Sequence, residues 1–207
     1  MAITNSEVPT EAEYRFKILD HSNWLSDDDC WKVFVPPCET MEALTARYTS
    51  SIWLEQVREP RLPRIVPIDI RKLFEVARSA IIYGYLCYPL LTLGMEQLYR
   101  TAEAAARLRA KDLGWLPSRE MHRYRGDLPD FKLAIQHLRK RRALTNADEK
   151  WWSRIMSLRN DASHPTFQAI DVPGRALTTL IDVREMVERL YKAKGVQEAT
   201  AGSQIDL

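Results

Sequence analysis

The sequence predicts an all-α fold, and three observations support this prediction. Apolar residues recur at helical spacing over most of the chain, no stretch alternates apolar and polar residues for long enough to form a strand, and prolines separate the periodic segments. The chain has 207 residues, of which 45% are hydrophobic and six are Trp. This is enough to bury one medium-sized core, so we expect a helical bundle.

Residues 1–58 are expected to form an N-terminal helical extension. Helical spacing occurs at Glu11–Asp20 and Asp28–Val35, and the acidic run at 27–29 suits a helix N-terminus better than a metal site. Glu39–Glu59 predicts an amphipathic helix. Its apolar stripe comprises Met41, Leu44, Tyr48, Ile52 and Val57. Three prolines then predict an extended linker over residues 59–67.

Residues 68–194 are expected to form the main helical domain, followed by a flexible tail at 195–207. Helical spacing continues from Asp69 to Lys111, and Pro89 should split this run into the two longest helices. A loop at 114–129 and a short helix at 130–142 follow.

Two further helices complete the expected domain. Asn146 and Glu149 have the spacing of a capping box, which predicts the start of a helix that runs to residue 158. A last helix should start near Asp171. Its buried side is expected to contain Leu177, Leu180, Ile181, Val187 and Leu190.

Composition excludes several classes of protein. Three cysteines without a Cys-x-x-Cys pair indicate neither a disulfide framework nor a zinc site. Ser79–Met95 is uncharged, but it contains Gly84, Pro89 and Gly94, and its 17 residues fall short of the roughly 20 that span a bilayer. We therefore expect a buried core helix there. The first residues lack the order of a signal peptide, so we expect a soluble cytoplasmic protein.

Basic residues are concentrated in one region, although the net charge is only +2. Residues 107–142 contain eleven basic and four acidic side chains. Such a segment is typical of a phosphate-binding surface, and a solvated helix face is the alternative. The candidates for RNA binding are Arg123, Arg125, Arg139, Lys140, Arg141 and Arg142.

The strongest chemical signal is Arg159 followed five residues later by His164, where Pro165 should end a helix. An imidazole can transfer a proton near neutral pH, and a guanidinium can hold a phosphate through two hydrogen bonds. This pair suits cleavage of RNA without a metal. Asn160 is positioned to orient the pair or to bond the backbone. The alternative is a helix C-terminus with an incidental His, because chance alone can produce one such spacing in an arginine-rich chain.

Residues 158–165, LRNDASHP, resemble the motif of the HEPN superfamily (higher eukaryotes and prokaryotes nucleotide-binding), which is Arg-x4–6-His, often with Asn after the Arg. The resemblance rests on Arg159, Asn160 and His164, and it implies a HEPN-like helical bundle over residues 68–194. Many members are metal-independent endoribonucleases of toxin–antitoxin or phage-defence systems. Others bind nucleotides or act as scaffolds without catalysis.

The resemblance also implies supporting residues and partners. Some members carry a Glu-x3-Lys/Arg element on the helix facing the motif, and Glu96 with Arg100 is similar to it. These two residues would then polarise the site or hold Arg159. An ordinary intrahelical ion pair is the alternative. Members pair two motifs across a twofold axis, so the resemblance implies a C2 homodimer with a composite site, and an antitoxin or defence partner.

The sequence therefore predicts an endoribonuclease that acts on single-stranded RNA with Arg159, Asn160 and His164 in its catalytic site. The other histidines lack partners at metal-ligand spacing, so we expect no metal and no cofactor. The alternative is a non-catalytic HEPN-like protein that binds nucleotides or RNA, or serves as a scaffold in a defence or regulatory complex.

Overall fold

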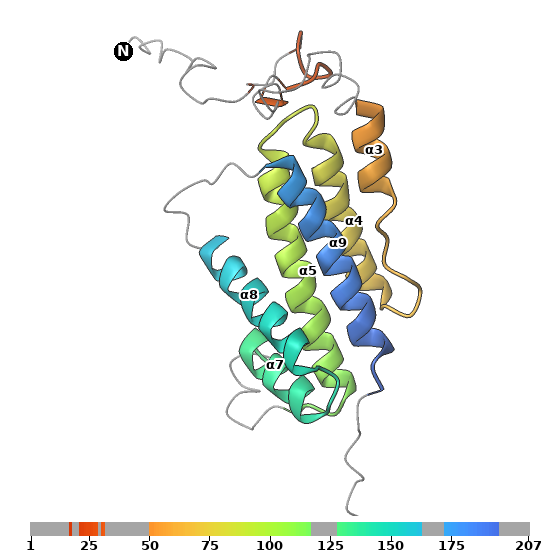
Figure 1. The fold of residues 1–207 in the computed structure, drawn as a ribbon, viewed down its shortest axis with the longest axis vertical. Coiled ribbons are helices and arrows are strands. Elements are labelled where there is room, and N and C mark those ends of the chain that lie inside the picture. The colour runs from red at the N-terminus through yellow and green to blue at the C-terminus, as the bar shows by residue number, and fades with distance from the viewer. Residues whose placement is uncertain are drawn as a thin grey trace, which may run out of the picture. The chain divides into compact units, whose positions relative to one another are not determined.

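The computed structural model describes residue 17 and residues 21–28, 30–31, 50–116, 128–162 and 172–194. Within these ranges the chain forms α-helices and no β-strand, which confirms the all-α prediction there (Figure 1). The helices are α3 (Ser50–Arg58), α4 (Ile68–Tyr83), α5 (Leu90–Asp112), α7 (Phe131–Lys140), α8 (Asn146–Ala162) and α9 (Pro173–Lys192). The chain divides into two compact units, and α4, α5 and α9 each run from one unit into the other.

The first unit contains residues up to Arg61 together with Phe74–Leu98 and Phe167–Ile181. Within it, α3 packs against the second half of α4. The Trp53 indole is 3% exposed, and its N–H donates to the Ile81 carbonyl at 3.1 Å. The expected buried position Val57 is confirmed, with no exposed surface. Residues 11–16, 18–20 and 32–49, where the other N-terminal helices and much of the expected stripe lie, fall outside the described residues.

Asp28 attaches the N-terminal segment to the turn between α4 and α5. Its carboxylate is buried and accepts hydrogen bonds from the backbone N–H groups of Tyr88 at 2.7 Å and Cys30 at 3.0 Å. The Trp31 indole N–H donates to the Gly84 carbonyl at 3.0 Å. Burial, followed by the charge of Asp28, raises the pKa of Cys87. Asp28 and Trp31 are therefore part of this unit's core.

Pro89 lies in the break between two helices, as the sequence predicts. The chain leaves α4 at Tyr83, six residues before Pro89, and α5 starts directly after the proline. The expectation that the two longest helices flank Pro89 is wrong in the described part of the chain. There α5 has 23 residues and α9 has 20, whereas α4 has only 16 because its helix ends before Gly84.

The uncharged stretch at 79–95 is not the single buried helix that we expected: it contains the end of α4, the turn at 84–89 and the start of α5, and only part of it is core. Ile81, Leu91 and Met95 have no exposed surface. At Gly94 an added Cβ would lie 2.5 Å from a side-chain carbon of Ile81 and 3.0 Å from the Ala77 carbonyl oxygen. Glycine therefore permits α4 and α5 to approach closely. Nowhere in the described ranges is a helix both long enough and apolar enough to cross a bilayer.

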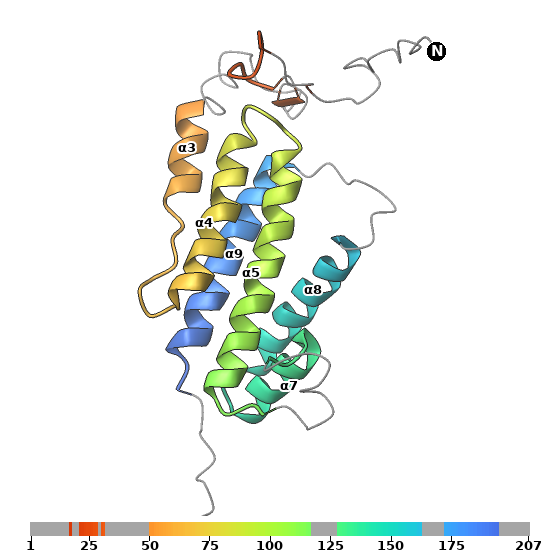
Figure 2. The same cartoon turned by 180° about the vertical axis from the view of Figure 1, so that it is seen from behind.

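The second unit contains Leu62–Leu73, Tyr99–Thr166 and residues from Asp182 onward. In it, α7 and α8 form a helical hairpin, and they lie side by side where α8 begins (Figures 1 and 2). The C-terminal end of α8 lies away from α7 in both views. The second half of α9 contacts α5, since the Tyr191 hydroxyl donates to the Ala105 carbonyl at 3.3 Å.

The start of α8 differs from the predicted capping box by one residue. Thr145 is the N-cap, and its hydroxyl oxygen accepts from the Asp148 N–H at 3.2 Å while the Asp148 carboxylate accepts from the Thr145 N–H at 3.0 Å. Glu149 pairs instead with Arg139 at 2.9 Å. Thr145 precedes the first helical residue, so Asn146 already lies inside the helix.

The buried side of α9 is predicted correctly at most positions. Leu180, Val187 and Leu190 are buried, and Leu177 is half-buried. The prediction is wrong for Ile181, which is 37% exposed. Consecutive residues of an α-helix point about 100° apart, so Leu180 and its neighbour cannot both face the centre of the same stripe.

A residue with positive φ that is not glycine follows the C-terminus of α7. Arg142 has φ 56°, the Ala143 N–H donates to the Leu138 carbonyl at 2.9 Å, and the Arg142 N–H donates to the Arg139 carbonyl at 2.9 Å. This pattern is a Schellman motif, in which glycine is the usual residue at this position. An arginine there carries the steric cost of a left-handed conformation.

We expect Arg142→Gly to raise the free energy of unfolding by about 0.5–1 kcal/mol, because glycine adopts positive φ without a Cβ clash. Urea denaturation followed by circular dichroism measures the change. Lys140→Gly is the matched control: it lies in the last helical turn, and glycine there should lower stability by about 0.5–1 kcal/mol. Loss of stability in Arg142→Gly would contradict the assigned backbone conformation.

Candidate active site

Arg159 and Asn160 lie in the last turn of α8, which ends at Ala162 in the described part of the chain. Trp152 and Ile155 are buried, with exposed fractions of 0% and 4%. Positions 152, 155 and 159 fall on one face of a helix. The same face that anchors α8 in the core therefore directs Arg159 toward α5.

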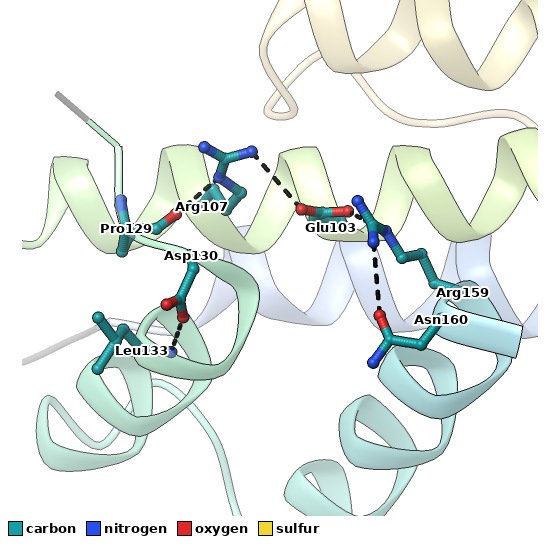
Figure 3. A network of polar contacts seen from close by, with 7 residues as sticks. All are labelled: Glu103, Arg107, Pro129, Asp130, Leu133, Arg159 and Asn160. Carbon is teal, nitrogen blue, oxygen red and sulfur yellow. Dashed lines mark hydrogen bonds and ion pairs between the residues drawn. The ribbon is translucent and has the colours of Figure 1, made fainter. Parts of the chain in front are cut away.

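On α5, the carboxylate of Glu103 holds Arg159. The Arg159 Nε–H donates to Glu103 Oε2 at 2.8 Å, and Figure 3 shows this contact bridging the two helices. The side chain of Glu103 is 14% exposed and that of Arg159 is 38% exposed. The Glu103 side chain is thus mostly withdrawn from water, while more than a third of the Arg159 side chain remains exposed.

Glu103 also contacts a second arginine one turn along α5. Its Oε1 lies 3.5 Å from Nη1 of Arg107, and the Arg107 Nε–H donates to the Pro129 carbonyl at 2.7 Å (Figure 3). One carboxylate therefore lies between two guanidinium groups, one on each oxygen. The formal charge of these three side chains is +1, which favours an anion.

Asn160 follows Arg159 and is exposed. Its Oδ1 lies 3.4 Å from Nη1 of Arg159, at the long end of the hydrogen-bond range. The amide oxygen thus faces the guanidinium that it was expected to orient. His164 lies outside the described residues, as do Arg123 and Arg125, so the geometry of the Arg159–His164 pair is not defined.

Glu96 and Arg100, the supporting pair expected from the sequence, both lie on α5. Glu96 is half-buried and Arg100 is exposed. The carboxylate that contacts Arg159 is Glu103, seven residues after Glu96. The sequence did contain a signal for it, since Glu103 and Arg107 form a second Glu-x3-Arg pair two helical turns further on.

The four basic residues at the end of α7 have different surroundings. Arg139 pairs with Glu149 at 2.9 Å, and Arg141 Nε lies 3.4 Å from His137 Nε2. Lys140 and Arg142 are exposed. These two are therefore better placed to contact a polyanion than their neighbours, because neither forms an ion pair with another of the described residues.

The length of α8 separates this basic end from Arg159. Arg159 lies thirteen positions after Asn146 in α8, which corresponds to about 20 Å along the helix axis. At about 3.4 Å per stacked nucleotide, a strand touching both ends would span roughly six nucleotides.

Two carboxylates, Asp148 on α8 and Asp182 on α9, have shifted pKa values. Burial would raise the pKa of Asp148, but hydrogen bonds from Thr145 and from Arg189 outweigh it and lower the pKa. Burial, with the charge of Glu185 adding to it, raises the pKa of Asp182, although Arg154 and a hydrogen bond from Trp151 oppose the shift. Asp148 therefore remains ionised, bound to Arg189 at 3.0 Å, and ties α8 to α9.

Among the residues that the structure describes, no group of three or more His, Cys, Asp or Glu side chains could hold a metal ion. Comparisons with known protein families, with curated proteins and with solved structures find no match for this chain.

Proposed function

We propose that this protein is a HEPN-like endoribonuclease that cleaves single-stranded RNA without a metal, possessing a site built on Arg159, Asn160 and His164. The observation that carries the proposal is the Arg159 side chain, whose guanidinium is held by Glu103 at 2.8 Å and which remains 38% exposed near the end of α8 as described. A fixed and accessible guanidinium suits the recognition of a phosphate. The sequence resemblance over residues 158–165 supplies the histidine.

In the proposed reaction, His164 takes the proton from a ribose 2′-hydroxyl. The resulting oxygen attacks the adjacent phosphorus in line, the bond to the 5′-oxygen breaks, and the products are a 2′,3′-cyclic phosphate and a 5′-hydroxyl end. Arg159 stabilises the charge that develops on the phosphorane. Only RNA has the required hydroxyl, so DNA should remain intact.

A single chain supplies one motif histidine, His164, which takes the proton from the 2′-hydroxyl. The leaving 5′-oxygen also needs a proton. We therefore propose a C2 homodimer in which a second copy contributes its own Arg159 and His164 to a composite site. Exposed apolar side chains within residues 79–95, such as Tyr83 and Leu93 at 59% and 51%, favour burial against another protein surface.

The alternative is a non-catalytic HEPN-like module that binds nucleotides or RNA, or a scaffold in a defence or regulatory complex with an antitoxin-like partner. The ion pair between Arg159 and Glu103 is the observation that favours this alternative, because it connects α8 to α5 and gives Arg159 a structural role. The two candidates differ in one respect: only the enzyme changes the covalent structure of RNA.

The test is incubation of the purified protein with single-stranded RNA and DNA of the same sequence in excess EDTA. The proposal requires RNA cleavage and no cleavage of DNA. Intact RNA across a pool of random sequences, with binding detected by fluorescence anisotropy, would support the non-catalytic module instead. Cleavage that occurs only with added Mg²⁺ would reject the mechanism.

A further inference from the structure

The contacts around Glu103 form a continuous chain of polar groups. The Pro129 carbonyl accepts from Arg107 Nε at 2.7 Å, Arg107 Nη1 lies 3.5 Å from Glu103 Oε1, and Glu103 Oε2 accepts from Arg159 Nε at 2.8 Å. Pro129 immediately precedes Asp130, whose carboxylate caps α7 by accepting from the Leu133 N–H at 2.8 Å. Figure 3 shows the whole arrangement. The capped start of α7 is therefore linked to Arg159 through two side chains of α5.

We propose that Arg107 is a positioning residue for Arg159 that acts through Glu103 and preserves a positive charge at the site. The inference rests on the proposed function in that it assigns Arg159 a phosphate ligand. Arg107 does not need to touch that ligand. It directs the carboxylate and supplies the charge that the carboxylate would otherwise cancel.

The charge argument compares the formal charge of the site without and with Arg107. Glu103 and Arg159 alone sum to zero, and a neutral pair attracts a phosphate weakly. With Arg107 the sum is +1, and the two guanidinium groups divide the carboxylate between its oxygens. Because the Glu103 side chain is only 14% exposed, water screens this effect less than it screens a surface pair.

The geometric argument concerns what fixes the carboxylate. Glu103 could rotate to give both oxygens to Arg159, the usual two-pronged arrangement of an arginine–carboxylate pair. Arg107 opposes that rotation by holding Oε1, and Arg107 is itself fixed by the Pro129 carbonyl. The guanidinium of Arg159 is thereby held through Nε, a nitrogen at its side rather than at its end.

The first experiment follows the Nε–H signals of arginine by ¹H–¹⁵N NMR on the intact protein, assigned with single Arg→Lys variants. We expect Arg107→Met to shift the Arg159 Nε–H signal and to change its rate of exchange with water. Arg184→Met is the matched control, because Arg184 also pairs with a glutamate four residues away, Glu188, at 2.7 Å in the same unit. An Arg159 signal that moves no more in Arg107→Met than in the control would overturn the proposal.

The second experiment separates binding from turnover in RNA cleavage. We expect Arg107→Met to raise KM by about three- to tenfold and to change kcat by less than about twofold, since it removes one charge near the phosphate. Arg107→Lys retains the charge and should recover most of the lost affinity. Glu103→Gln should instead lower kcat more than it raises KM, because the net positive charge of the site rises by one while Arg159 loses the carboxylate that fixes its orientation.

These outcomes distinguish the inference from the proposed function. If wild-type protein cleaves no RNA, the NMR comparison still tests the link between Arg107 and Arg159. If RNA is cleaved in a His164-dependent manner while Arg107→Met leaves both KM and the Arg159 signal unchanged, the function stands and the inference fails. Should Arg107→Met not fold, Arg107→Gln gives the same two readouts, because it also removes the charge.

Discussion

Replacing His164 with alanine is expected to lower the rate of RNA cleavage by about 10²–10⁴, the usual contribution of a positioned acid–base group. The proposed reaction has no other group in the motif that accepts a proton near neutral pH. A midpoint of thermal unfolding equal to that of the wild-type protein would show that the lost rate is not a loss of folding. Single-turnover cleavage of a labelled RNA, with thermal unfolding measured in parallel, gives both quantities.

Arg159→Ala serves as the companion to this variant. It should lower the rate by about 10²–10³ through lost stabilisation of the phosphorane. It also leaves the carboxylate of Glu103, 14% exposed, without its partner on α8. Arg159→Lys retains the charge but cannot reproduce the guanidinium geometry. Cleavage that persists unchanged in His164→Ala would count against the mechanism, whatever the arginine variants do.

Trp152→Ala is expected to lower the free energy of unfolding by about 3–5 kcal/mol, the typical cost of removing a fully buried aromatic side chain. Trp152 has no exposed surface, and its ring packs edge-on against Phe131 and Trp151 at centroid distances of 6.3 and 5.1 Å. The same side chain anchors the face of α8 that carries Arg159. Urea denaturation followed by circular dichroism measures the loss.

Two variants sharpen this prediction. Trp151 is half-buried, so Trp151→Ala should cost clearly less than the substitution next to it. Trp152→Phe keeps the aromatic packing and removes an indole N–H that is buried without a hydrogen-bond partner in the described structure. It should therefore recover most of the stability. A Trp152→Ala variant as stable as Trp151→Ala would show that the hairpin of α7 and α8 is not held by this core.

Much of the fold was predictable because helical periodicity and prolines are local signals. The break at Pro89 and the buried positions Leu180, Val187 and Leu190 follow from them. Two of the errors, at Asn146 and at Ile181, arose where two neighbouring residues satisfy the same rule. Thr145 and Asn146 are both good N-caps, and the structure uses Thr145 because Asp148 completes its capping box.

The candidate site was only partly predictable. Arg159 could be chosen from its local context, but its partner Glu103 lies 56 residues earlier, and such a pairing depends on how two helices pack. From the sequence we identified only one Glu-x3-Arg pair on α5, Glu96 and Arg100, and did not consider the second pair, Glu103 and Arg107. To choose between these two pairs, which are seven residues apart, one must know which turn of α5 lies next to Arg159. No local sequence pattern encodes that.

The central claim is that Arg159 and His164 cleave RNA through the ribose 2′-hydroxyl. The most direct measurement is end-group analysis of a single-stranded RNA cut in excess EDTA, compared with the same RNA carrying one 2′-deoxynucleotide at the mapped cleavage position. The account predicts 2′,3′-cyclic phosphate and 5′-hydroxyl ends from the first RNA, and no cleavage at the substituted position of the second. Cleavage at the deoxynucleotide, or products with a 5′-phosphate, would contradict it.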